Sequence, residues 1–69
     1  MEYVKVSYPD LKKVLVDGEE AGWTNEIMRL EEGTHTFCID CLRSRPKSRT
    51  VRITGTNELD PKEVRFARK

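Results

Sequence analysis

Short apolar runs separated by turn-forming residues constrain this chain more than any other feature. Each run has the length of a strand, and the glycines and acidic residues at the boundaries tolerate the positive φ angles of tight turns. The central stretch shows three such segments, residues 14–16, 27–30 and 34–41, bounded by Asp17-Gly18, Gly22 and Glu32-Gly33. This spacing predicts a β-meander, with Asp17-Gly18 as the strongest hairpin signal.

The flanking parts of the chain alternate between apolar and polar residues. Residues 3–8 do so with period two, which places Val4, Val6 and Tyr8 on one face. We interpret this segment as an edge strand that ends at the following Pro-Asp pair. Two more strands are expected at residues 48–54 and 62–67 on the same evidence.

These strands predict an all-β fold. We expect one domain over residues 1–69, a small antiparallel two-sheet β-sandwich of six or seven strands. A chain of this size buries only about 60% of the surface of its unfolded state, which leaves no room for a deep catalytic cleft. The expected core consists of Val4, Val6, Val14, Val16, Ile27, Leu30, Phe37, Ile39, Val51, Ile53, Val64 and Phe66.

Three segments of the chain carry a motif pattern. Residues 14–18 read V-L-V-D-G, residues 22–24 read G-W-T and residues 30–37 read L-E-E-G-T-H-T-F. These segments resemble the PEGA domain family, whose patterns are V-x-V-D-G, G-x-T-P and G-x-H. The resemblance covers about residues 13–66. It departs from the family at Asn25 and Glu31, where the family has proline, and after Cys41, where no Gly-Tyr pair follows.

The resemblance implies architecture more than activity. PEGA domains are small β-sandwiches found in bacterial and archaeal multidomain and surface proteins, without a known active site. It also places His35 at the family's G-x-H position, where we expect the imidazole to bind a turn carbonyl. The chain has a single histidine and no nucleophile–base pair for it to serve. We therefore expect no enzymatic activity and no catalytic residue.

Cys38 and Cys41 form a C-x-x-C pair within the strand expected at residues 34–41. An extended backbone places them on opposite faces about 10 Å apart, beyond the reach of a disulfide. Zinc sites usually need four Cys or His ligands, and redox pairs need a helix N-terminus. We expect two structural or free thiols and no cofactor or metal; the alternative is a metal shared between molecules with His35.

Charge is balanced overall but uneven along the chain. The net charge of +1 comes from 13 basic and 12 acidic residues. Acidic residues dominate residues 17–32, whereas residues 43–52 carry five basic residues and no acidic one. Arg49 and Arg52 are three apart and cannot share a strand face. Because no aromatic residue interleaves with these bases to stack on nucleobases, we favour a solvated loop over a nucleic-acid site.

The function that best fits these features is a non-enzymatic interaction or structural module. Trp23 is expected to pack against the sandwich, since it offers a large apolar surface with one N–H to satisfy; an exposed Trp23 would instead be the first contact residue. The partner would be a protein or a neighbouring domain, and the alternative is a nucleic-acid-binding domain that uses residues 43–52. The candidate contact residues are Trp23, Arg43, Arg45, Lys47, Arg49 and Arg52.

The sequence contains neither a run of about 20 apolar residues nor the layout of a signal peptide. We expect no membrane span and a cytoplasmic location for the chain as given, or an extracellular one if it belongs to a longer surface protein. Exposed edges at residues 3–7 or 62–67 would allow dimerisation by strand addition. The pattern does not specify an oligomeric state.

Overall fold

The computed structural model describes residues 1–40, 44–45 and 47–68, with residues 44 and 45 as backbone only. The described residues form strands and no helix. The strands are β1 (Glu2–Ser7), β2 (Lys13–Val16), β3 (Glu19–Trp23), β4 (Ile27–Leu30), β5 (Gly33–Ile39), β6 (Ser44–Arg45), β7 (Ser48–Ile53), β8 (Lys62–Arg65) and β9 (Ala67–Arg68). Every strand expected from the alternation is present, with ends that differ by a few residues.

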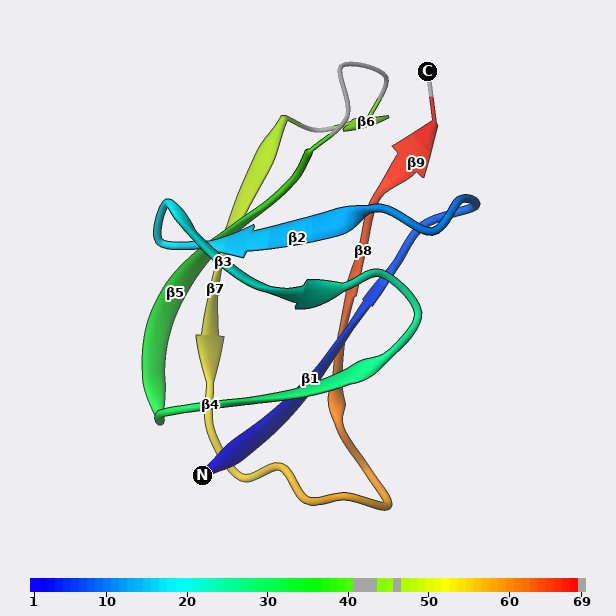
Figure 1. Cartoon of the computed structure of the whole chain (residues 1–69). Helices are drawn as coiled ribbons and strands as arrows, with labels where there is room; N and C mark the ends of the chain where they lie inside the picture. The colour runs from blue at the N-terminus through cyan, green and yellow to red at the C-terminus, as the bar shows by residue number, and fades with distance from the viewer. Residues whose placement is uncertain (41–43, 46, 69) are drawn as a thin grey trace.

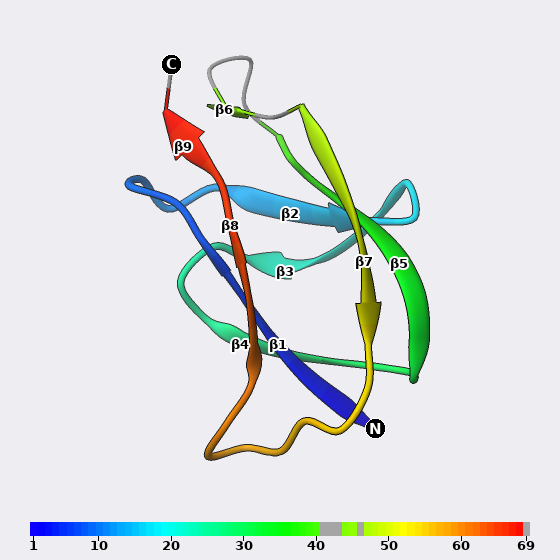
Figure 2. The same ribbon diagram turned by 180° about the vertical axis from the view of Figure 1, so that it is seen from behind.

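Two sheets pack against each other, as Figures 1 and 2 show from opposite sides. One sheet has the strand order β4-β1-β8, and the other has the order β3-β2-β5-β7. The short pair β6-β9 lies at the end of the molecule where the C-terminus is found (Figure 1). The pairings are antiparallel except for β1 with β8, which is parallel. The predicted small two-sheet β-sandwich is confirmed, and the parallel pairing of β1 with β8 differs from the antiparallel arrangement that we expected.

Two details of the predicted connectivity are wrong. First, β1 is the central strand of its sheet, so residues 3–7 offer no free edge for strand addition. Second, residues 14–41 do not form a meander, because β2 pairs directly with β5 and β4 pairs with β1 in the other sheet. The alternation pattern identifies strands but carries no information about which strands pair.

Strand β3 was not expected, because its sequence E-E-A-G-W lacks β-branched residues. It forms because Asp17 and Gly18 close a two-residue hairpin with β2. Both residues have positive φ, 53° for Asp17 and 85° for Gly18, as a type I′ turn requires. The hairpin prediction at Asp17-Gly18 therefore identified the correct turn, but the returning strand is Glu19–Trp23 rather than residues 27–30.

Thr24 is fully buried where the chain leaves β3 for the other sheet. Its hydroxyl donates a hydrogen bond to the carbonyl of Asp10 at 2.6 Å and accepts one from the amide of Lys12 at 2.9 Å. Its own amide donates to the carbonyl of Lys12 at 2.9 Å. These three bonds fasten the crossover to the segment that leads into β2.

Asn25 completes the same crossover with a positive φ of 66°. Its side-chain amide donates to the carbonyl of Tyr8 at 2.8 Å, and its side-chain oxygen accepts from the amide of Tyr8 at 3.3 Å. The backbone amide of Asn25 also donates to the carbonyl of Val6 at 2.7 Å. A proline at this position, as in the family pattern, has φ near −65° and no N–H, so it would be incompatible with this geometry.

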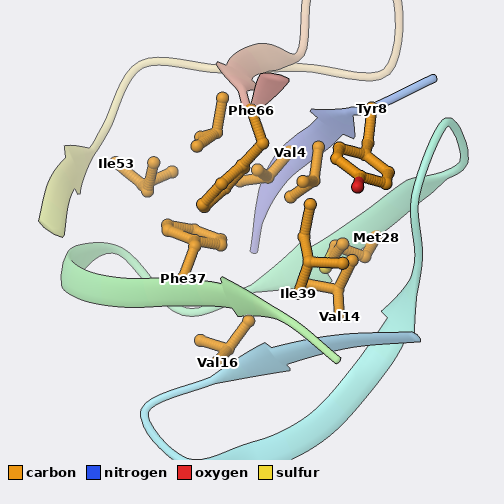
Figure 3. Close-up of a cluster of buried hydrophobic side chains, with 11 residues drawn as sticks. Val4, Tyr8, Val14, Val16, Met28, Phe37, Ile39, Ile53 and Phe66 are labelled. Carbon is orange, nitrogen blue, oxygen red and sulfur yellow. The ribbon is translucent and has the colours of Figure 1, made fainter. Parts of the chain in front are cut away.

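The core lies between the two sheets. Figure 3 shows the buried side chains converging there, with Phe37 and Phe66 pointing toward each other. Leu30 and Val51 pack against this cluster while partly exposed. The buried apolar residues are Val4, Val6, Tyr8, Val14, Val16, Met28, Phe37, Ile39, Ile53, Val64 and Phe66.

Ile27 was expected in the core and is instead 51% exposed, while Met28 is buried. Ile27 and Leu30 are three residues apart and cannot share one face of a strand. The strand pairs Val4 of β1 with Met28 and not with Ile27, which turns Met28 and Leu30 inward. The other apolar residues expected inside the sandwich are buried or packed against its core.

Candidate functional site

Trp23 lies on β3, at one edge of the four-stranded sheet, and is 45% exposed. The prediction that it packs into the sandwich is wrong. Trp23 pairs with Lys13, and the next residue, Val14, is the one that points into the core, so the register places Trp23 on the solvent side. The Lys13 ammonium lies 5.5 Å from the centroid of the indole ring and 3.2 Å from a carboxylate oxygen of Glu20.

Half-buried side chains cover the sheet next to Trp23. The register pairs Leu15 of β2 with Cys38 of β5, and pairs Cys38 with Ser48 of β7. Two residues further along these strands, the hydroxyls of Thr36 and Thr50 lie 3.0 Å apart. We call this solvent side the outer face, formed by Lys13, Leu15, Glu20, Trp23, Thr34, Thr36, Cys38, Ser48, Thr50 and Arg52.

The basic residues do not gather into one patch. Arg52 pairs with Thr34 on the outer face, whereas Arg49 pairs with the buried Phe37 and donates from its guanidinium to the carbonyl of Arg65 at 3.0 Å. The prediction that Arg49 and Arg52 lie on opposite faces is confirmed. Lys47 is exposed just before β7.

Two of the predicted contact residues cannot be placed as side chains. Arg43 lies outside the described residues, and Arg45 belongs to β6 with its side chain outside the described part. Among the candidates that are described, the structure brings Trp23 and Arg52 to the same outer face, at opposite edges of one sheet. It turns Arg49 toward the other sheet.

His35 connects two turns. Its Nδ1 lies 2.8 Å from a carboxylate oxygen of Asp17 in the β2–β3 turn, and its Nε2 lies 2.7 Å from the carbonyl oxygen of Glu31, just after β4. The expected bond to a turn carbonyl is therefore present. The other oxygen of Asp17 accepts from the amide of Thr36 at 2.9 Å, and the amide of Asp17 donates to the carbonyl of Thr36 at 2.8 Å.

These contacts shift two pKa values in opposite directions. The pKa of Asp17 is lowered, first by the hydrogen bond from the amide of Thr36 and then by that from His35. The pKa of His35 is raised, first by its hydrogen bond to Asp17 and then by the one to the carbonyl of Glu31. Both shifts favour the charged forms, so the pair is an ion pair at mildly acidic pH.

A shallow hollow opens beside His35. Its apolar lining comes from Val16, Ala21 and Leu30, and its carboxylates come from Asp17, Glu19, Glu20 and Glu31. The acidic stretch of the sequence thus becomes one local surface, where β3 approaches the end of β4. Within the described part of the chain, no lysine or arginine lines this hollow, and His35 is its basic residue.

Cys38 is a half-buried free thiol on the outer face, and Cys41 lies outside the described residues. The prediction that Cys38 and Cys41 lie on opposite faces, too far apart for a disulfide, is therefore untested. Among residues 1–40, 44–45 and 47–68, no three His, Cys, Asp or Glu side chains are grouped so that they could hold a metal ion. In the same residues, no helix has the length and apolar character needed to cross a membrane.

Comparisons with protein-family models, with curated proteins and with solved structures return no match to this chain.

Two features of this region were missed at the level of sequence. The sequence identifies Asp17 as a turn residue but does not reveal that its carboxylate binds His35, which is 18 positions away. The exposure of Trp23 follows from the register of β3, a strand with no clear signal of its own. The useful signal was the D-G turn: taken as a type I′ hairpin, it places Glu19 and Glu20 opposite Val16 and Leu15. A register shift between Val14 and Leu15 then brings Trp23 opposite Lys13, and the turn alone does not predict this shift.

Proposed function

We propose that this chain is a non-enzymatic interaction module that binds a protein partner or a neighbouring domain through its outer face. The observation that carries the proposal is the 45% exposure of Trp23 at the edge of a sheet. Tryptophan is enriched among the few residues that dominate the binding energy of protein interfaces, because it buries a large apolar area on contact.

The surroundings of Trp23 support this use. Lys13 and Glu20 provide charged groups beside the ring, while Leu15 and Cys38 continue the face with half-buried apolar surface. Protein interfaces commonly combine an apolar centre with a polar rim. The resemblance to the PEGA family, which implies a β-sandwich without an active site, is consistent with the same proposal.

The nucleic-acid alternative has weaker support. Single-stranded nucleic acids are usually bound by basic side chains interleaved with aromatic ones. Here Trp23 and the basic strand β7 lie at opposite edges of the sheet, and the guanidinium of Arg49 is engaged by the carbonyl of Arg65. Lys47 and Arg52 are the basic residues near β7 that the structure describes as exposed without such a contact.

The proposal is tested by affinity capture from extracts of the source cells with immobilised wild-type, Trp23→Ala and Ile27→Ala proteins. Ile27 is the matched control, because it is 51% exposed but lies on β4 in the other sheet. Truncation of a dominant interface residue costs about 2 kcal/mol or more, which corresponds to roughly 30-fold in affinity. We expect proteins that bind the wild type and Ile27→Ala but are lost with Trp23→Ala; if no captured protein distinguishes the two variants, the outer face is not the interface.

A titration with RNA distinguishes the protein-binding function from the nucleic-acid-binding one. Short single-stranded RNA is added to the folded protein at low and at moderate salt, and backbone amide shifts are followed. The proposal expects no specific shifts. Shifts confined to residues 47–52 that fade with added salt would replace it with the nucleic-acid function, because phosphate contacts release counterions and weaken as salt rises.

A further inference from the structure

The ring of His35 has a hydrogen-bond acceptor at each nitrogen. The carboxylate of Asp17 and the carbonyl of Glu31 both accept hydrogen bonds, and neither can donate one. A neutral imidazole carries one N–H and can satisfy only one of them. Both acceptors lie within 3 Å of a ring nitrogen, and only the doubly protonated ring can donate to both.

We propose that His35 is a proton-dependent clamp, whose doubly protonated ring ties the β2–β3 turn and the β4–β5 turn together and which releases the β4–β5 turn when it loses a proton. The turn that is released follows from bond strength. A hydrogen bond to a carboxylate is charge-assisted and stronger than one to a neutral carbonyl. The remaining proton therefore stays on Nδ1 facing Asp17, and Nε2 presents its lone pair to the oxygen of Glu31.

The charged side chains that surround the imidazole ring of His35 in the hollow are carboxylates. Asp17 faces His35 from the β2–β3 turn. Glu19 and Glu20 of β3 line the same hollow, as does Glu31, which follows β4. Within β5 the nearest ring is that of Phe37, edge-on at 6.4 Å between centroids. The pKa of His35 is raised above its ordinary value of about 6.5, first by the hydrogen bond to Asp17 and then by the one to the carbonyl of Glu31, and the negative charges of these two residues add to the shift while burial opposes it.

The pH window follows from the two shifts. His35 binds its proton more tightly in the folded state, so its stabilisation is complete below pH 6.5 and is lost as the pH rises through the higher folded-state pKa. Asp17 has a lowered pKa, so its contribution is complete above about pH 3.8 and is lost as the pH falls through the folded-state value. The clamp is therefore closed between these limits and opens toward alkaline pH.

Opening the clamp changes one surface of the molecule. Residues 31 and 32 connect β4 to β5, which begins at Gly33, and Leu30, just before them, packs only partly against the core. When Glu31 loses its partner, this end of β4 loses a tertiary attachment. The proton thus controls an attachment beside the hollow whose apolar lining is Val16, Ala21 and Leu30.

The first test follows imidazole nitrogen and backbone amide signals of the wild-type protein from pH 5 to pH 9. We expect His35 to titrate above pH 6.5, the proton to leave Nε2 while Nδ1 keeps its own, and amide shifts and hydrogen-exchange rates to change at residues 31–33 more than at residues 17 and 18. The proposal is overturned if the proton leaves Nδ1 instead, if residues 31–33 do not respond, or if the pKa of His35 is 6.5 or lower.

The second test uses Asp17→Asn, a matched variant that keeps the size of the side chain and tolerates the positive φ of 53°. Its amide oxygen can still accept from Thr36, and its amide nitrogen can donate to Nδ1 of a neutral ring, whose Nε2–H then donates to Glu31. The neutral imidazole is fully satisfied there. We expect the pKa of His35 to fall and the decline of wild-type unfolding free energy above pH 6.5 to disappear in the variant; equal pH slopes for both proteins would refute the clamp.

Discussion

The substitution Thr24→Val tests whether one buried hydroxyl fastens the crossover between the sheets. Valine keeps the shape of the side chain and removes the bonds to the carbonyl of Asp10 and the amide of Lys12, at 2.6 and 2.9 Å. Each lost hydrogen bond costs about 1 kcal/mol, and more where the abandoned group stays buried. Asp10 and Lys12 are partly exposed, which lets water reach them, so we expect a total loss of about 2–3 kcal/mol.

That loss is a large fraction of the stability of a domain of this size. At roughly 0.05–0.15 kcal/mol per residue, a chain of 69 residues has about 3.5–10 kcal/mol. Urea unfolding followed by circular dichroism measures the change. With a slope of about 1 kcal/mol per molar urea, the midpoint should fall by about 2–3 M.

Thr24→Ser is the control for this measurement. It keeps both hydrogen bonds and removes one methyl group, for an expected loss of about 1 kcal/mol. If Thr24→Val is as stable as Thr24→Ser or more so, the hydroxyl does not fasten the crossover and the reasoning fails.

Two further predictions concern the burial of neighbouring residues on β4 and the positive φ angle in the crossover. Met28→Ala should lower the free energy of unfolding by about 2–3 kcal/mol, whereas Ile27→Ala should change it by no more than about 0.5 kcal/mol, because Met28 is buried and Ile27 is exposed. Urea unfolding measures both changes, and similar losses for the two variants would contradict the register of β4. Asn25→Gly should lower the free energy of unfolding by about 1–2 kcal/mol, because the side-chain hydrogen bonds to Tyr8 are lost. Asn25→Ala should lower it by about 1 kcal/mol more, because alanine is strained at a positive φ. Thermal unfolding compares the two variants, and an alanine variant more stable than the glycine variant would contradict this reasoning.

The strands were predictable because period-two alternation is a local property. Val4 and Val6, or Phe37 and Ile39, face the same way wherever their strand pairs, so the sequence identifies them as core residues without knowledge of the topology. The turn at Asp17-Gly18 was predictable for a similar reason, since few dipeptides accept two positive φ angles. The hydrogen bond from His35 to a turn carbonyl was expected from the family resemblance and depends on a partner only four residues away.

The candidate site was less predictable because its residues come from different strands. Trp23 was expected inside the sandwich, and its exposure depends on β3 pairing with β2 in a register that leaves Lys13 on the solvent side. The opposite faces of Arg49 and Arg52 were predictable from their spacing on a strand, but the hydrogen bond from Arg49 to the carbonyl of Arg65 on β8 was not, because it joins the two sheets.

The sequence by itself determined the secondary structure class, most strand positions, the hairpin turn and most of the core, because these follow from the local order of apolar, polar and glycine residues. Tertiary structure alone decided that β4 crosses to the other sheet to pair with β1, that an acidic segment becomes the edge strand β3, and that Asp17 meets His35. Each of these depends on contacts between residues distant in the chain. Alternation of side chains cannot encode such contacts, because it is the same for every possible pairing of the strands.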